Sequence, residues 1–216
     1  MNEVAAKLID ARVIAIVRGV DETDILKLAQ ALCRGGVSAI EVTFDQRHPD
    51  SWHSTMRAIA SIARELDGRV LPGAGTVLTP EQVDMARDSG ARYIISPDVN
   101  ADVIARTRQL GLASLPGALT PSEITLAARL GCDIVKVFPA GDMGAGYVKS
   151  LCAPLAHIPM FAVGGITLNN AADFLRAGAL GLGVGGQLTR LDLIREGRFD
   201  QIEQNARALM QVVRGV

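Results

Sequence analysis

Short apolar runs of four to six residues alternate with helix-patterned segments along the whole chain, and this alternation restricts the possible folds most strongly. Consecutive runs lie too far apart for hairpins, so neighbouring strands are expected to be parallel. Parallel strands linked by helices form covered α/β sheets, which need apolar residues on both faces. The predicted strands are 13–17, 39–44, 70–75, 93–96, 112–115, 134–138, 160–163 and 181–184.

Helical segments precede the first strand and follow the others. Two begin with the same signal, a threonine before a proline, at Thr79-Pro80-Glu81-Gln82 and Thr120-Pro121-Ser122-Glu123. The threonine hydroxyl can cap free N–H groups, and proline suits the first helical position. We expect Thr167 to begin the helix after 160–163. Further predicted helices are 3–10, one capped by Asp21 or Thr23, 51–66, 101–110, 146–155 and 199–213.

Eight strands alternating with eight helices predict a closed (β/α)₈ barrel, the TIM barrel, as a single domain over residues 1–216 with an N-terminal helix. An open doubly wound sheet is the alternative, but the even strand number and the glycine-rich last strand favour closure. A chain of 216 residues is short for a barrel, so we expect no long inserted loops.

Charge and composition exclude several classes of function. The net charge is −1 and the basic residues are scattered, which argues against nucleic acid and anionic membranes as partners. The first 17 residues carry four charges and fit neither a signal peptide nor a membrane span. Three cysteines without metal-like spacing indicate reduced thiols in a cytoplasmic protein. His48 and His53 flank a proline in a polar stretch, so we expect no metal site.

Lys136 is out of place in the strand 134–138. Alternation puts Ile134, Lys136 and Phe138 on one face, and Val135 and Val137 on the other. Neither face resembles a protein surface, so Lys136 is predicted to point inward. A buried ammonium group is energetically unfavourable, and such a lysine either finds a partner or loses its proton.

Glu41, inside the strand 39–44, is the natural counterpart of Lys136. A buried structural ion pair is one interpretation, although such pairs often add no net stability. In the second interpretation, which is functional, Lys136 is a neutral nucleophile that forms a Schiff base with a carbonyl carbon. Glu41 would then move protons between water, the carbinolamine and the leaving hydroxyl.

Further candidates lie where strands end, because barrel sites form there. The pairs Gly164-Gly165 and Gly185-Gly186 follow the last two strands, where backbone N–H groups and helix N-termini can hold a phosphate. Tight barrel packing or turns are the alternative explanation for these glycines, but their position after the last two strands favours a phosphate site. Arg18, at the end of the first predicted strand, is the best candidate for a cation that binds a substrate carboxylate. The alternative is that it is a solvated loop residue. Thr76 could hydrogen-bond a substrate carboxylate or hydroxyl.

Five motifs stand in the order in which one known family carries them. They are Glu41-Val42-Thr43, Gly73-Ala74-Gly75-Thr76-Val77-Leu78, Ser96-Pro97, Lys136-Val137-Phe138-Pro139-Ala140 and Val163-Gly164-Gly165-Ile166. They resemble the class I 2-keto-3-deoxy-6-phosphogluconate (KDPG) and 4-hydroxy-2-oxoglutarate (KHG) aldolases, including the 2-keto-3-deoxy-6-phosphogalactonate (KDPGal) branch, over nearly the whole chain. The resemblance implies a homotrimeric barrel that needs no metal or cofactor. Such enzymes cleave a 2-keto-4-hydroxy acid to pyruvate and an aldehyde, glyceraldehyde 3-phosphate or glyoxylate.

By this resemblance, Lys136 is the Schiff-base lysine and Glu41 the general acid and base. Thr76 and Pro97 would line the pyruvate end of the site, and Phe138 would pack beside the lysine.

The chain departs from the family pattern at two positions. Asp45 stands where many KDPG aldolases have the arginine that holds the carboxylate. Val17-Arg18-Gly19 resembles the KDPGal branch instead, so Arg18 is expected to take that role. Gln187 replaces a serine that often follows the last glycine pair, which leaves an unphosphorylated substrate open.

Two more remote functions also fit a phosphate-binding barrel. An isomerase or epimerase that uses metal would need histidine at the strand ends, where this chain has none. A non-catalytic sugar-phosphate sensor would keep its function after Glu41→Gln, whereas an aldolase would lose activity.

Overall fold

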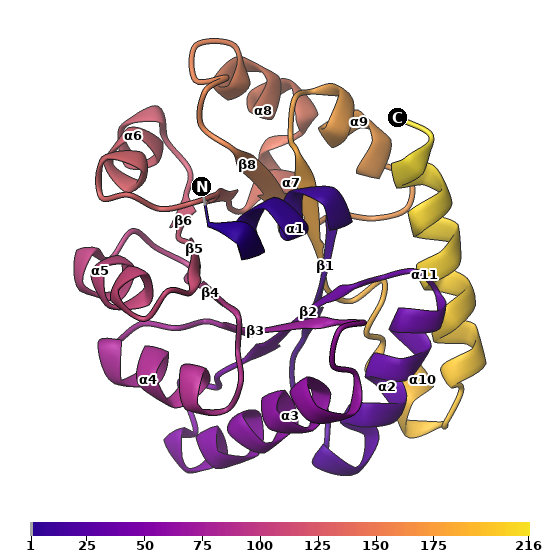
Figure 1. The fold of residues 1–216 in the computed structure, drawn as a ribbon. Helices are drawn as coiled ribbons and strands as arrows, with labels where there is room; N and C mark the ends of the chain where they lie inside the picture. The colour runs from indigo at the N-terminus through magenta and orange to yellow at the C-terminus, as the bar shows by residue number, and fades with distance from the viewer. Residues whose placement is uncertain (1) are drawn as a thin grey trace.

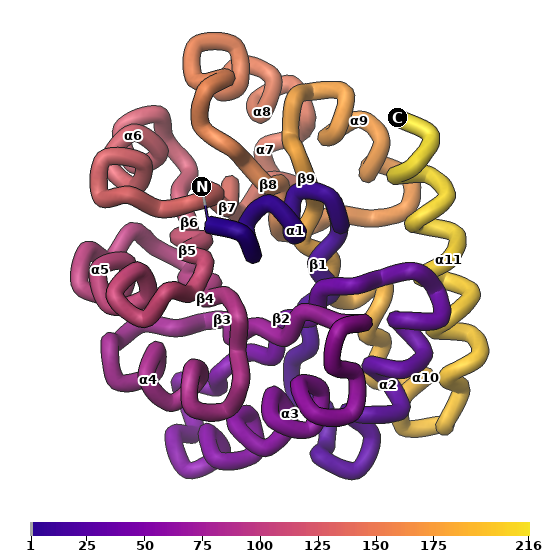
Figure 2. The backbone as a smooth tube through the Cα atoms, in the orientation of Figure 1, coloured from indigo at the N-terminus to yellow at the C-terminus, as the bar shows by residue number. Residues whose placement is uncertain are grey.

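A computed structural model describes residues 2–216 and shows nine parallel strands in one sheet, in the order β5-β4-β3-β2-β1-β9-β8-β7-β6. The strands form a central ring that helices surround, as Figures 1 and 2 show. The strands are β1 (Val13–Val17), β2 (Ala39–Thr43), β3 (Leu71–Gly75), β4 (Tyr93–Ile95), β5 (Ala113–Leu115), β6 (Gly117–Ala118), β7 (Val135–Val137), β8 (Met160–Val163) and β9 (Gly181–Val184).

The two ends of this strand order, β5 and β6, are consecutive pieces of one segment. β5 pairs with β4, β6 pairs with β7, and Pro116 separates the pieces. Proline has no N–H to donate to a ladder, which explains the interruption, while its carbonyl accepts the Lys136 N–H at 2.9 Å. The sheet therefore closes through its own chain. This confirms the (β/α)₈ barrel and excludes the open sheet, with the predicted strand 112–115 extended by β6.

The helices follow the predicted order, with several differences in their limits. Thr79 and Thr120 cap α4 and α6 as expected, and Glu123 completes a capping box. Thr167 does not cap a helix: its N–H donates to Asn170 Oδ1, and α9 begins at Ala171. Two short helices, α7 and α10, were not predicted. The helices are α1 (Glu3–Ala11), α2 (Glu22–Arg34), α3 (Trp52–Glu65), which a 3₁₀ turn (Pro49–Ser51) precedes, α4 (Pro80–Asp88), α5 (Ala101–Gln109), α6 (Pro121–Arg129), α7 (Ala140–Met143), α8 (Ala145–Cys152), α9 (Ala171–Arg176), α10 (Leu191–Arg195) and α11 (Phe199–Arg214).

The apolar residues form two separate cores. The larger core lies between the sheet and the surrounding helices and contains Val135 and Val137. The smaller core fills the barrel interior and contains Ile134, so the predicted two faces of the strand at Lys136 are confirmed. α1 crosses one barrel opening in Figures 1 and 2, and its side chains belong to the interior core. They are Val4, Ala5 and Leu8.

Asp133 fastens α1 to the barrel. Its carboxylate accepts the backbone N–H of Asn2 at 3.1 Å and that of Ser114 at 3.0 Å. We expect Asp133→Ala to lower the free energy of unfolding by about 1–3 kcal/mol, because two N–H groups lose their acceptor. Urea denaturation would measure this loss. Asp50→Ala, which removes an exposed carboxylate, is the matched control, and equal stability of the two variants would contradict the anchor.

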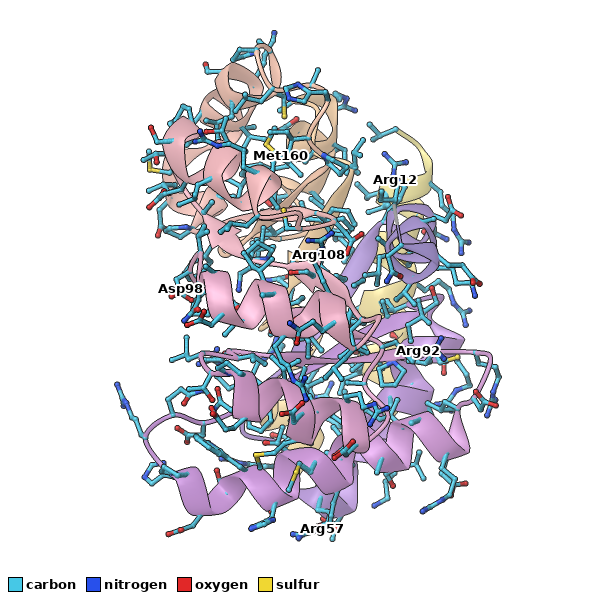
Figure 3. The ribbon with its side chains drawn as sticks, turned by 60° about the vertical axis from the view of Figure 1, so that its left-hand side comes forward. Arg12, Arg57, Arg92, Asp98, Arg108 and Met160 are labelled. Atoms are coloured by element: carbon cyan, nitrogen blue, oxygen red, sulfur yellow. The ribbon has the colours of Figure 1, made fainter. Side chains whose placement is uncertain are left out.

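The opposite barrel opening is where the strands end. In Figure 3, Arg12 and Arg92, which precede β1 and β4, lie on one side of the molecule, and Asp98, which follows β4, lies on the other. α1 therefore closes the amino-terminal opening and leaves the carboxyl-terminal one to the loops.

Within residues 2–216, no helix combines the length and the apolar character needed to cross a membrane.

Candidate active site

A cavity of about 580 Å³ opens at the carboxyl-terminal side of the barrel. Part of its wall is formed by glycines that bring no side chain into the cavity, Gly183 within β9 and the two glycine pairs that follow β8 and β9. Every residue that the sequence analysis proposed for the site lines it. These residues are Arg18, Glu41, Thr76, Pro97, Lys136, Phe138, Gly164, Gly165, Gly185 and Gly186, joined by Ile16, Val163, Ile166, Thr167, Gly183 and Gln187.

Lys136 extends from β7 toward the barrel axis and is 8% exposed. Its register neighbours are Gly117 on β6 and Phe161 on β8. The Nζ atom lies 4.8 Å from the centre of the Phe138 ring, so the predicted packing of Phe138 beside the lysine is present. Burial lowers the pKa of the Lys136 amine; Glu41 opposes this shift and the Arg18 charge adds to it. The surroundings thus favour the neutral, nucleophilic amine.

Glu41 faces Lys136 from the far wall of the barrel and is 2% exposed. Going round the barrel from β2 to β7 in one direction, the sheet passes through three strands, β1, β9 and β8. In the other direction it passes through β3, β4 and the β5–β6 segment. The strands are thus diametrically opposed, and inward side chains near their ends converge on the axis. Burial raises the pKa of the Glu41 carboxyl, whereas Lys136 and Arg18 act to lower it.

Glu41 and Lys136 do not form the buried ion pair considered from the sequence. In the described part of the chain Glu41 Oε2 is buried without any hydrogen-bond partner. The carboxyl lies over Gly75, where a Cβ atom would overlap Glu41 Oε1. The space between acid and amine belongs to the cavity that both line. A substrate carbonyl and its hydroxyl can therefore be held between the two side chains.

Arg18 and Thr76 form a polar pair beside the acid. Arg18 Nη2 donates to Thr76 Oγ1 at 3.2 Å, and both side chains line the cavity. Asp45 lies outside it: its carboxylate accepts the Arg47 N–H and contacts His48 Nδ1, each at 2.9 Å. Arg18 therefore brings a guanidinium to the cavity, whereas the Asp45 side chain lies outside it.

Thr76 has a backbone conformation that its side chain disfavours. Its φ of +56° lies in the left-handed region, which costs a non-glycine residue roughly 1–2 kcal/mol. The Thr76 carbonyl accepts from Gln46 Nε2, and Gln46 Oε1 accepts from Gln82 Nε2 at 3.1 Å. Gln82 is fully buried, and its Oε1 accepts the Leu78 N–H at 2.7 Å. These contacts fix the loop in which Thr76 lies.

Gln46 and Gln82 were not predicted as site residues from the sequence. The only local signal in the sequence was that Gln82 is a polar residue in the first turn of α4, where a neighbouring loop could bury it. Its partner Gln46 lies 36 residues away and carries no local pattern.

The two glycine pairs leave backbone donors free at the cavity mouth. The N–H groups of Gly165, Ile166, Gly186 and Gln187 donate to no backbone acceptor within residues 2–216. All four residues line the cavity, so these donors can receive an anion. The expected support from helix dipoles is wrong, because α9 has six residues and begins only at Ala171, and a turn follows Gly186.

No group of three or more histidine, cysteine or acidic side chains in the described residues could hold a metal ion. The cavity instead combines an amine whose pKa is lowered by burial, a buried acid, one guanidinium and free N–H donors. This set suits covalent catalysis on a carbonyl compound that also carries negative charge.

Comparisons with known proteins agree with this chemistry. A family model described as KDPG and KHG aldolase matches residues 4–205. The chain is 34% identical over 203 residues to the 2-dehydro-3-deoxy-6-phosphogalactonate aldolase of Escherichia coli (strain K12), covering 93% of this chain and 94% of the relative. It is also 34% identical over 203 residues to the 2-dehydro-3-deoxy-phosphogluconate aldolase of Treponema pallidum (strain Nichols), covering 94% and 93%.

A solved structure with the same fold is KDPG aldolase from Legionella pneumophila, in which pyruvate was captured as a covalent carbinolamine intermediate. It superposes with a TM-score of 0.85 at 25% identity, covering 95% of this chain and 97% of that one.

Proposed function

Because the chain belongs to the KDPG and KHG aldolase family, we propose that it cleaves a 2-keto-4-hydroxy acid through a Schiff base on Lys136. The chain is a class I aldolase, a carbon–carbon lyase. The single observation that carries the residue assignment is the cavity geometry. A buried amine and a buried acid face each other across it without neutralising each other in an ion pair.

The reaction begins when the Lys136 amine attacks the C2 carbonyl carbon of the keto acid. The Lys136 nitrogen gives up one proton and Glu41 supplies a second, both to the former carbonyl oxygen, which leaves as water as the iminium ion forms. The C3–C4 bond then breaks, its electrons move into the iminium, and the C4 hydroxyl proton passes to Glu41. The aldehyde departs, C3 of the enamine takes a proton, and water releases pyruvate and restores the lysine.

Sodium borohydride tests this covalent step. With pyruvate present, reduction should fix one pyruvate-derived group on the protein, and peptide mass analysis should place it on Lys136. A chelator should leave the yield unchanged. If pyruvate and borohydride leave the mass of the protein as it was, the Schiff-base mechanism is wrong.

Arg18 and Thr76 are proposed to hold the substrate carboxylate. The Arg18 guanidinium is the fixed cation of the cavity, and the Thr76 hydroxyl lies 3.2 Å from it. We expect Arg18→Ala to raise KM for the keto acid about 10- to 100-fold, the equivalent of one hydrogen bond to a charged group. Steady-state kinetics measures this, with Arg47→Ala as the control for the loss of an exposed positive charge nearby. An unchanged KM would remove Arg18 from this role.

A phosphate at the far end of the substrate is proposed to rest on the glycine pairs. The four free N–H donors and the hydroxyl of Thr167 support this. KDPG, which gives glyceraldehyde 3-phosphate beside pyruvate, is the first phosphorylated candidate; KHG, which gives glyoxylate, is the candidate if the substrate carries no phosphate. KDPGal is the alternative, and the place of Arg18 in the cavity favours it. A coupled assay with the three substrates decides between them: if KHG were cleaved as efficiently as the phosphorylated acids, the phosphate cradle would be wrong.

A homotrimer in the cytoplasm completes the proposal. The trimer follows from the family resemblance, and light scattering of the purified protein measures its mass directly. The reducing compartment is supported by Cys33, Cys132 and Cys152, all of which are free thiols.

A further inference from the structure

Two side-chain atoms in residues 2–216 are buried without a hydrogen-bond partner. One is Oε2 of Glu41, and the other is the hydroxyl of Tyr93. An unpartnered buried polar atom is costly, and native proteins keep few of them unless they serve a purpose. Both atoms belong to the same barrel interior, which suggests a common explanation.

The strand register brings these two side chains together. Glu41 on β2 and Tyr93 on β4 are both register partners of Gly73 on β3, so β3 lies between them. The Tyr93 ring covers Gly73, and the Glu41 carboxyl covers Gly75, since a Cβ atom at either glycine would overlap them. Gly73 and Gly75 face the same way and lie roughly 6.6 Å apart along the strand. The ring and the carboxyl are therefore neighbours over one face of β3.

The interior offers Tyr93 few other partners. The buried residues of its cluster are aliphatic or phenylalanine, for example Ile14, Ile95 and Phe161. Burial raises the pKa of Tyr93 well above its ordinary value, and the neighbouring Glu41 carboxylate raises it further. The phenol therefore stays neutral and keeps its proton available for donation.

We propose that Tyr93 is a positioning residue for Glu41, and that its hydroxyl donates to a water molecule that in turn donates to the carboxylate, since the two side chains are neighbours but make no direct hydrogen bond. This inference rests on the function proposed above, in which Glu41 moves protons. This water bridge would hold the carboxyl over Gly75, facing Lys136, and would stabilise its ionised form. A phenylalanine would fill the same space over Gly73 without supplying the donor.

The groups that face Glu41 determine the sign of the pH effect. Lys136 from β7 and Arg18 from the end of β1 are the charged ones, and Tyr93 from β4 is the remaining titratable one. The other neighbours, Ile16 and Gly75, do not titrate. Glu41 and Lys136 titrate as a coupled pair, so the acid limb of kcat/KM reports the pair. Loss of the Tyr93 donor favours the protonated form of the Glu41 carboxyl. The acid limb of kcat/KM must therefore move to higher pH.

Tyr93→Phe tests the proposal because it removes only the hydroxyl. We expect kcat to fall about three- to tenfold, the value of one hydrogen bond, with KM nearly unchanged. The acid limb of kcat/KM should rise by about half a pH unit to one unit. Tyr147→Phe is the matched control, since it removes the other tyrosine hydroxyl, which donates to the Leu119 carbonyl at 2.8 Å. That variant should keep the kcat and the pH profile of the parent.

The double variant Glu41→Gln/Tyr93→Phe separates positioning from a structural role. If the hydroxyl acts through Glu41, the second substitution should change kcat little in the Glu41→Gln background. Equal losses in both backgrounds would overturn the proposal, and so would a folded Tyr93→Phe protein with an unchanged kcat and acid limb. The pyruvate adduct keeps this result apart from the proposed function: if it forms on the parent protein, the Schiff base stands even where the Tyr93 proposal fails.

Discussion

Replacing Lys136 by alanine is expected to lower kcat/KM for keto acid cleavage by about 10⁵-fold or more, because the covalent intermediate cannot form. The pyruvate adduct trapped by borohydride should disappear as well. The variant should still fold, since it removes a buried amine that stabilises no ion pair in the described residues. Circular dichroism and a thermal melt check this point.

Two further variants make the result specific to the nucleophile. Lys136→Arg keeps the positive charge but cannot become neutral, so it should be as inactive as the alanine variant. Lys149→Ala removes an exposed amine on α8 and should keep the parent activity and the adduct. Residual cleavage by Lys136→Arg at more than a few per cent of the parent rate would show that the charge, and not the amine nucleophile, is what the reaction needs.

Glu41→Gln is expected to lower kcat about 10²- to 10⁴-fold, the usual contribution of general acid–base catalysis. Glutamine has nearly the same shape and remains over Gly75, so the cavity should keep its form. The pyruvate adduct should still form, but slowly, because carbinolamine formation and loss of water both need a proton donor. Single-turnover kinetics with pyruvate and borohydride separates these steps.

The pH profile of Glu41→Gln gives a second, independent readout. Burial and Arg18 lower the pKa of Lys136, and the Glu41 carboxylate raises it. Removing the carboxylate therefore lowers this pKa further, so the residual activity should persist to lower pH than in the parent. Glu65→Gln, an exposed change on α3, is the control. If Glu41→Gln kept ligand affinity and full turnover, Glu41 would not be the proton carrier, and the sensor interpretation would gain support.

Much of the fold could be predicted because it depends on local patterns. The two-residue alternation in β7 correctly separates Ile134 in the interior core from Val135 in the outer one. The threonine–proline signals correctly locate the starts of α4 and α6. The same reasoning is wrong at Thr167, whose N–H is bound by Asn170, because the sequence pattern does not show which acceptor the chain will offer.

The site was predicted as a set of residues but not as an arrangement. Charged residues inside predicted strands were enough to name Lys136 and Glu41, and a strand end was enough to name Arg18; all three line one cavity. The contacts that fix Thr76 were not predictable, since Gln46 and Gln82 lie 36 residues apart and meet only through the packing of two loops. Tyr93 was predicted only as a strand residue, because its contact with Glu41 also arises only from packing.

Local sequence patterns were enough to predict the alternation of strands and helices and the burial of Lys136, because side-chain direction in a strand has a period of two residues. What Lys136 faces, in contrast, depends on how the strands are arranged in space. Closure of the sheet through the β5–β6 segment puts β2 opposite β7, so that Glu41 and Lys136 meet across the cavity without an ion pair. That relation depends on the register of every intervening strand, which no local stretch of residues contains.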